Sequence, residues 1–314
     1  MKNPVSPEPW PTLPPLSEWE ESFATLHLWT QIVGKIRLAQ SPWTNHSWHA
    51  PLYVTARGLT TSPIPHGRRI FQIDFDFVGH SLQVLTAEGA TRSIALAPRS
   101  VADFHHELFA ILDSLGLPVE IHGTPNEIED AIPFGEDQTH ASYDAEQVNR
   151  FWRGLLQADR VLKSFRAGFL GKASPVHFFW GSFDLAVTRF SGRDAPPHPG
   201  GFPNLPDWVA REAYSHEVSS AGFWPGLGLG EAAFYSYAYP APPGFSGSPV
   251  APADARWDSA LGEFILPYRS VQQSADPDAA VAAFLESTYR AAAQGAEWDV
   301  ERLERAPLSV PPAP

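Results

Sequence analysis

The chain has 314 residues, with 22 Lys and Arg against 35 Asp and Glu, which gives a formal net charge of −13. This excess of acid argues against a protein that binds nucleic acid or attaches to a membrane through basic residues, because both need a basic surface. Cys is absent, which excludes disulfides, thiolate catalysis and Cys-based metal sites. A transition metal such as Zn, Fe or Mn would therefore be bound by His, Asp and Glu alone.

The start of the chain, residues 1–16, is rich in Pro and is predicted to be an extended lead-in. It lacks the apolar core of a secretory signal, and no run in the chain approaches the ~20 apolar residues of a membrane span. We therefore expect a soluble, cytoplasmic protein without a membrane partner.

Residues 17–143 are predicted to form a first lobe of mixed α and β structure. Ser17 and Glu20 have the spacing of a capping box, and apolar residues at intervals of three and four predict a helix to about residue 38. From about residue 50 the apolar period changes to two, which predicts consecutive antiparallel strands. A second helix is predicted over 100–115, followed by a further strand at 118–123.

Residues 144–306 are predicted to form a second lobe. Asp144 is placed to cap a long helix that ends near Gly168. Strands are predicted within 174–193, 231–240 and 262–270, and a last helix over 276–295. The final residues, 307–314, are predicted to be a loose tail.

The two lobes show signs of an internal duplication. Ser41, Pro42 and Leu52 have counterparts at an offset of 133, and Arg99-Ser100-Val101 matches Arg269-Ser270-Val271. The alternative is two unrelated halves that share common turn chemistry. We expect an α+β fold of two similar lobes, each an antiparallel sheet packed on helices, with a pocket at their shared seam.

Histidine is the side chain best suited to acid–base work or metal binding near neutral pH. Residues 207–218 can form a short helix, which would place Glu212 and His216 one turn apart, a spacing at which two side chains can reach one metal ion. His216 and its neighbour Glu217 are also candidate catalytic groups, and His46 is a further candidate metal ligand. The alternative for His216 is a protonated side chain at a helix C-terminus.

The apolar segment HFFWGSFDL contains two ionisable residues, His177 and Asp184. His177 is a candidate catalytic base, and the alternative is a hydrogen-bonded core histidine. Asp184 must be paired or hydrogen-bonded if it is buried, and it could orient one of the catalytic histidines. Because Arg189 would lie on the opposite face of a regular strand, we expect the partner of Asp184 to come from outside that strand.

Arg57 and Arg189 hold similar positions in the two halves. A guanidinium group suits a carboxylate or phosphate, so either could hold an anionic substrate, and the alternative is a pair of cross-strand ion pairs. Trp48, Trp180 and Trp224 lie beside the candidate polar groups. They are predicted to form the walls of the pocket. The alternative is that they belong to an ordinary hydrophobic core, where aromatic residues are also common.

Five segments resemble known sequences: TLHLWTQIVGK (25–35), PLYVTARGLTTSPIP (51–65), HASYD (140–144), SPVHFFWGSFDLAVTRFSGR (174–193) and AYSHEVSSAGFWPG (213–226). They resemble a bacterial family that is known only as a domain of unknown function. The resemblance covers nearly the whole chain and implies a stand-alone bacterial protein. It implies no activity, so it assigns no functional residues.

Together these features predict an enzyme that acts on a small anionic or aromatic molecule in a pocket lined by His, Glu and Asp and walled by Trp, with or without a metal. The alternative is a non-catalytic module that binds a small molecule or cofactor. The sequence leaves both functions, and the oligomeric state, open.

Overall fold

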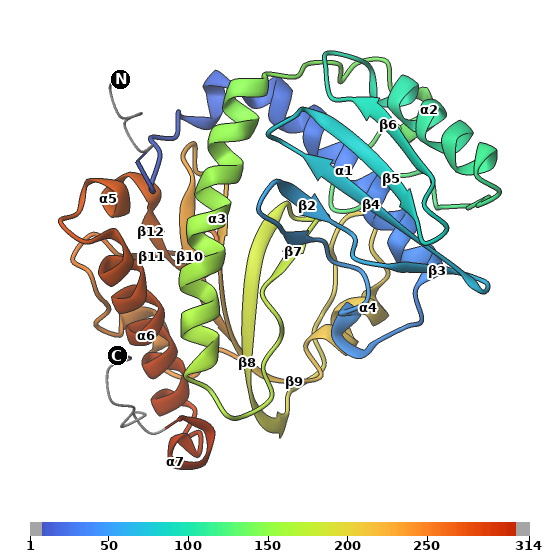
Figure 1. The fold of residues 1–314 in the computed structure, drawn as a ribbon. Helices are drawn as coiled ribbons and strands as arrows, with labels where there is room; N and C mark the ends of the chain where they lie inside the picture. The colour runs from blue at the N-terminus through green and yellow to red at the C-terminus, as the bar shows by residue number, and fades with distance from the viewer. Residues whose placement is uncertain (1–7, 306–314) are drawn as a thin grey trace, which may run out of the picture.

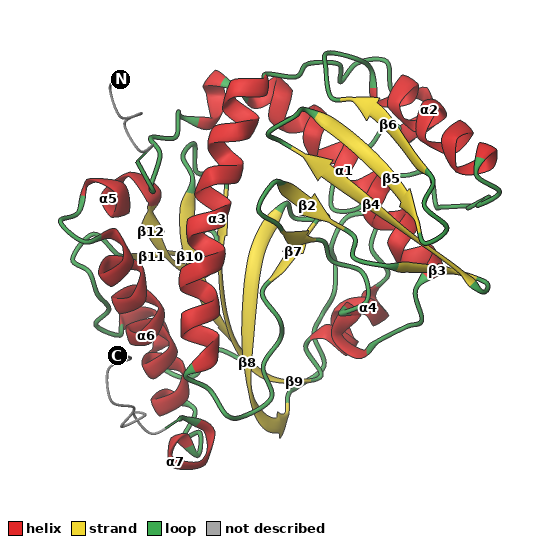
Figure 2. Ribbon diagram, viewed as in Figure 1, coloured by secondary structure: helices red, strands yellow, loops and turns green. Residues whose placement is uncertain are grey.

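The computed structural model describes residues 8–305, which form two lobes, each with a six-stranded antiparallel sheet (Figures 1 and 2). In the first lobe the sheet has the order β1-β2-β4-β5-β6, with β3 paired to β4. Its elements are α1 (Glu20–Gln40), β1 (Tyr53–Val54), β2 (Gly58–Thr60), β3 (Ile64–His66), β4 (Arg69–Asp76), β5 (Ser81–Thr86), β6 (Thr91–Ala95) and α2 (Val101–Ser114).

The second lobe has the strand order β11-β12-β10-β9-β8-β7. Its elements are α3 (Ala145–Ala167), β7 (His177–Phe179), β8 (Asp184–Asp194), α4 (Asp207–Ala213), β9 (His216–Trp224), β10 (Ala233–Tyr239), β11 (Arg256–Asp258), β12 (Glu263–Pro267), α5 (Tyr268–Gln273), α6 (Pro277–Gly295) and α7 (Val300–Leu303). Short 3-10 turns lie at η1 (Leu16–Glu18), η2 (Asn45–Ser47), η3 (Phe134–Glu136) and η4 (Phe245–Gly247). The predicted α+β fold of two sheet-containing lobes is therefore confirmed.

The two sheets meet at their edges. Leu52, just before β1, and Phe178 in β7 exchange two backbone hydrogen bonds of 2.9 and 2.8 Å. Both halves have the order helix, antiparallel strands, helix, which is the order that the sequence pattern predicts. The duplication itself stays a prediction.

Helix α1 is buried on all sides and not along a single stripe. Trp29 is fully buried, as the periodicity predicts, but Gln31 on another face is fully buried too. The reason is that the second lobe also reaches α1: the ring of Trp180 packs against the backbone at Gly34, where a Cβ would overlap it. The buried Gln31 donates a hydrogen bond of 2.9 Å to the carbonyl oxygen of Asn126.

Four local predictions need correction or restriction. Ser17 lies in η1 and does not cap α1, which begins at Glu20 after Trp19. Residues 118–123 form a loop and not a strand. The lead-in is described from residue 8, and Trp10 is buried against the second lobe with its indole N–H donating to Asp278 at 3.0 Å. The predicted tail, 307–314, lies outside the described residues.

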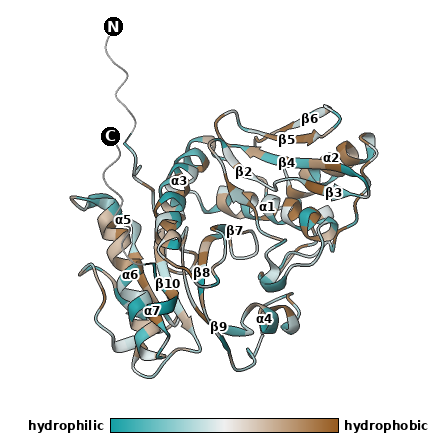
Figure 3. Cartoon of the chain, turned by 60° about the horizontal axis from the view of Figure 1, so that its bottom comes forward, coloured by the Kyte–Doolittle hydropathy of each residue, from teal (hydrophilic) through white to brown (hydrophobic). Residues whose placement is uncertain are grey.

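The helices α3 and α6 cover one face of the second sheet (Figure 1). Both are amphipathic, and Figure 3 shows hydrophobic and hydrophilic positions along α3. Because strand side chains alternate between faces, every second residue of β8, β9 and β10 points away from these helices. That other face of the sheet faces α4 and η2. Within residues 8–305 no helix has both the length and the apolar composition needed to cross a membrane.

Candidate functional site

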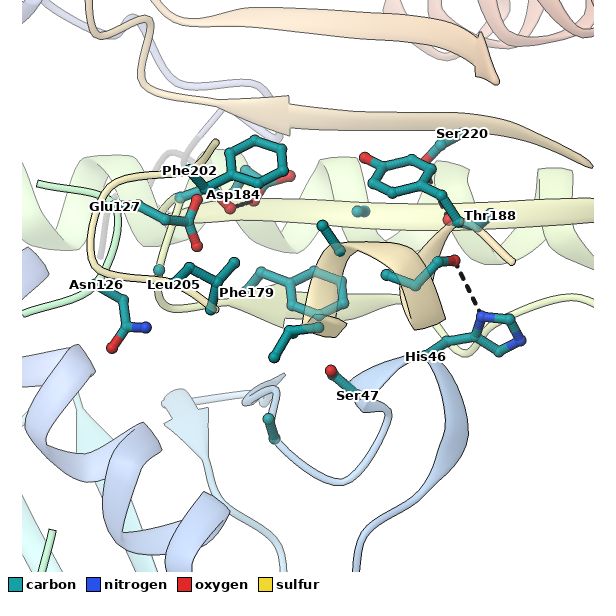
Figure 4. A pocket seen from close by; sticks show the side chains of 18 of the residues that line it. His46, Ser47, Asn126, Glu127, Phe179, Asp184, Thr188, Phe202, Leu205 and Ser220 are labelled. Atoms are coloured by element: carbon teal, nitrogen blue, oxygen red, sulfur yellow. Dashed lines mark hydrogen bonds between the residues drawn. The ribbon is translucent and has the colours of Figure 1, made fainter. Parts of the chain in front are cut away.

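A cavity of about 640 Å³ lies on the face of the second sheet that α3 and α6 leave free (Figure 4). Its floor consists of alternate residues of three strands: Asp184, Ala186, Thr188 and Phe190 from β8, Val218, Ser220 and Trp224 from β9, and Tyr235 and Tyr237 from β10. A strict period of two in these strands therefore builds the floor of the cavity.

The roof comes from three separate segments. One is α4 with the loop before it, and the others are first-lobe segments around η2 and around Glu127. Hydrogen bonds hold these segments together. His46 donates to the carbonyl oxygen of Ala213 at 3.0 Å, and the backbone N–H of Glu127 donates to the carbonyl oxygen of Pro203 at 2.8 Å. The cavity thus lies between the second sheet and loops of the first lobe, which agrees with the predicted position at the seam.

Unusual backbone conformations gather around the cavity. A positive φ is uncommon outside Gly, and such strain often marks functional sites. Eight non-Gly residues within 8–305 have a positive φ, and three of them line the cavity. These three are His46, Ser47 and Glu127.

Asp184 is the most enclosed acid of the cavity. Its side chain is buried and accepts hydrogen bonds from the hydroxyls of Ser182 and Tyr235. Tyr235 belongs to β10, so this donor comes from outside β8, as expected for the partner of Asp184. Burial raises the pKa of Asp184, and the same burial raises the pKa of Tyr235 well above its usual value, so this tyrosine stays a donor.

Two further carboxyl groups belong to the lining. Burial and the nearby charge of Asp184 raise the pKa of Glu127 to about 7. Burial and the charges of Asp184 and Asp258 raise the pKa of Glu263 to about 8. These three lining acids therefore resist simultaneous ionisation, because each charge disfavours the next.

A row of hydroxyl groups extends across the floor from β8 to the roof. The Thr188 hydroxyl lies 2.9 Å from that of Ser220, and the Tyr214 hydroxyl lies 2.8 Å from that of Tyr237. Burial raises the pKa of Tyr214 and of Tyr237, the latter to about 12, so both are uncharged at neutral pH. They offer hydrogen bonds to a ligand without adding charge.

The structure brings part of the predicted site together. Asp184, His46, Trp48, Trp180 and Trp224 all line the cavity. The other predicted residues, which are His177, His216, Glu217, Glu212, Arg57 and Arg189, are not among its lining residues.

The predicted metal ligands do not gather into one group. The helix expected over 207–218 is wrong, because α4 ends at Ala213 and His216 begins β9. Glu212 accepts a hydrogen bond from the indole of Trp43 at 2.9 Å. Since Nδ1 of His46 donates to a carbonyl, its Nε2 is an acceptor, and it lies 2.6 Å from the amine of Lys172. Within residues 8–305, no three His, Cys, Asp or Glu side chains are placed to hold a metal ion.

The two predicted anion-binding arginines serve other contacts. Arg57 pairs with Asp76 at 2.6 Å in the first lobe. Arg189 is buried on the helix side of β8, where its guanidinium lies 3.4 Å from the ring centre of Phe165. Alternation along β8 is the reason, because an odd-numbered residue there faces α3. Glu217 likewise pairs with Arg193 at 2.7 Å.

His177 is 1% exposed and lies at the seam beside Trp48 and Tyr53, with neither ring nitrogen hydrogen-bonded within the described residues. Burial, with the charges of Arg37 and Arg166, lowers its pKa to about 3. The folded protein then binds fewer protons here than the unfolded chain between pH 3 and the ordinary His pKa of about 6.5. The contribution of His177 to the free energy of unfolding is therefore fully present above this pH range, and it is lost as the pH falls through the range.

We therefore expect the free energy of unfolding to fall between pH 7.5 and pH 5.0 by about 2 kcal/mol more in the native chain than in the variant His177→Phe. Urea denaturation at the two pH values measures this difference. An equal loss in both proteins would show that His177 does not titrate in this way.

Sequence reasoning missed several lining residues. Tyr235 and Tyr237 could have been found, because the alternation in AFYSYAY places them on one face of a strand. Glu127 and Glu263 carry no such signal. Glu127 lies in a loop, and only the folded chain brings it to β8 of the other lobe.

Comparison with known proteins gives one match. A family model described as "Family of unknown function (DUF5996)" matches residues 10–305. No curated protein and no solved structure matches the chain. Because the family model covers nearly all the described residues, it agrees with the resemblance carried by segments such as AYSHEVSSAGFWPG. The chain belongs to the DUF5996 family, a family of unknown function.

Proposed function

We propose that the chain binds a small molecule with an aromatic or otherwise apolar body in the cavity on the second sheet. One observation carries this proposal. Of the eight large hydrophobic side chains that are exposed within residues 8–305, five line this cavity. Exposed apolar side chains that gather at one place mark a binding surface. The five are Trp43, Phe202, Trp208, Leu227 and Leu261.

The size and chemistry of the cavity support a small ligand. Its volume of about 640 Å³ is typical of small-molecule sites, which combine apolar walls with a few placed polar groups. Lys and Arg are missing from its lining among the described residues. The cavity therefore favours the aromatic class of ligand over the anionic one.

A binding module is the function that this geometry supports best, because Asp184 is the one member of the predicted catalytic set that lines the cavity. The second candidate is an acid–base enzyme that uses Asp184 and Glu127. It is favoured by the charge interaction between these two carboxyl groups, which lie near each other in Figure 4.

Filling the cavity tests the proposal. We expect the neutral dye N-phenyl-1-naphthylamine to bind the native chain, and Ala186→Trp to weaken this binding by at least about tenfold, because the new indole would occupy the floor of the cavity. Fluorescence titration measures the affinity.

The matched control is Ser93→Trp, which places the same side chain at an exposed position of β6 in the other lobe. It should leave dye binding unchanged. Equal dye affinity in both variants would place the binding site elsewhere.

A further inference from the structure

The charges of the cavity are unbalanced. Its lining within residues 8–305 contains three carboxyl groups, from Glu127, Asp184 and Glu263, and no Lys or Arg. A buried carboxylate is costly unless a positive charge or hydrogen-bond donors compensate it. Any counter-charge inside the cavity must therefore arrive with the ligand.

Asp184 is held in a fixed position but keeps capacity for a ligand. One carboxylate oxygen accepts from Ser182 and the other from Tyr235, and each oxygen can accept a second hydrogen bond. Gly222 makes this arrangement possible, since a Cβ there would overlap the Tyr235 hydroxyl. The sheet thus orients Asp184 for an incoming donor.

Glu127 comes from the first lobe and lies near Asp184 in Figure 4, where the charge of Asp184 acts on its carboxyl group. The carboxyl group of Glu127 lies against Gly181, where an added Cβ would overlap it. Within the described residues this carboxyl group makes no hydrogen bond. A carboxyl group that leans over the turn before Asp184 without a partner is placed to share one donor with it.

The opposite end of the cavity differs in charge. His46 lies there (Figure 4), and the Lys172 amine, which lies 2.6 Å from its Nε2, stands over the rings of Trp48 and Phe190 at 5.3 and 5.0 Å. The positive group therefore lies beside His46, at the end of the cavity away from Asp184 and Glu127, and is already packed on aromatic rings. The electrostatic field along the cavity draws a cation toward Asp184.

We propose that the cavity recognises an ammonium group carried on an aromatic or apolar body, with Asp184 and Glu127 as its counter-charge. This inference rests on the proposed binding function and names its ligand class. The ammonium group donates to both carboxylates, and the aromatic floor, with Tyr235 and Trp224, favours a cation further.

Three indole probes that differ in charge test this inference. Tryptamine is a cation, tryptophol is neutral and indole-3-propionate is an anion. Displacement of N-phenyl-1-naphthylamine at pH 8.5 measures their affinities. We expect tryptamine to bind at least tenfold more tightly than either of the others. Asp184→Asn should remove most of this preference, because it should weaken tryptamine binding much more than tryptophol binding.

Glu127→Gln guards against a folding defect in Asp184→Asn, because Glu127 lies in a loop and not in the sheet. It should weaken tryptamine binding several-fold. The matched control is Glu129→Gln, an exposed residue two positions along the same loop, which should have no effect.

Tryptophol or indole-3-propionate binding as tightly as tryptamine would overturn the inference. So would the failure of tryptamine to displace a dye that does bind, although the cavity would then remain a binding site. Failure of the dye itself to bind would overturn the proposed function as well.

Discussion

Replacing Gly222 by Ala is expected to lower the free energy of unfolding by about 3 kcal/mol and to abolish dye binding in the cavity. A Cβ at this position would overlap the backbone oxygen of Leu185 on β8 and the hydroxyl of Tyr235 on β10. The backbone oxygen lies in the middle of the sheet, so it cannot move without separating β8 from β9. The alternative movement takes Tyr235 away from Asp184 and leaves that buried acid with one donor fewer.

Urea denaturation, followed by tryptophan fluorescence, measures the stability loss. The matched control is Gly247→Ala, because a Cβ there meets no other atom within 4 Å. This control should stay within about 0.5 kcal/mol of the native chain. If Gly222→Ala were as stable as Gly247→Ala, the contact of Tyr235 with Asp184 across β9 could not be as described.

Tryptamine affinity is expected to rise about tenfold or more between pH 6 and pH 8.5. Burial and the charge of Asp184 raise the pKa of Glu127 to about 7. The neighbouring acids are Asp184 and Glu263; Tyr235 faces Asp184, and Asp258 faces Glu263. An ammonium group favours the ionised carboxylate, so the complex binds fewer protons than the free protein. Affinity therefore grows with pH until the free carboxyl groups have ionised, while the alkylammonium probe stays charged.

Dye displacement at a series of pH values measures this profile. Glu127→Gln should flatten it, and the surface control Glu129→Gln should not. The neutral probe tryptophol should show no rise. A tryptamine affinity that is constant between pH 6 and pH 8.5 would mean that no carboxyl group changes its protonation on binding.

Much of the fold was predictable because it follows from local patterns. The caps at Asp144 and Asp276 start α3 and α6: the Asp144 side chain accepts two backbone N–H groups of the first turn, and the Asp276 side chain accepts one. The alternation of β4 buries Phe71, Ile73 and Phe75 on one face of the first sheet. In these segments the local propensity and the final packing agree.

The wrong prediction of a helix through His216 has a physical cause. The helix predicted through His216 ends at Ala213, because residues 216–224 pair with β8 and β10 along most of their length. Pairing with strands that are distant in the sequence outweighed the weak local preference for a helix. The predicted convergence of His216 with Glu212 depended on that helix and was lost with it.

By itself, the sequence determined the α+β class, the two lobes, the lack of any Cys chemistry and the face of β8 on which Asp184 lies, because these depend on composition and on short-range periodicity. Only the tertiary structure decided which groups meet in the cavity. It placed Glu127 of one lobe beside the turn that precedes Asp184 of the other lobe. Such encounters depend on how the two sheets and their loops pack, and no local pattern in the chain encodes the distance between residues that are far apart in it.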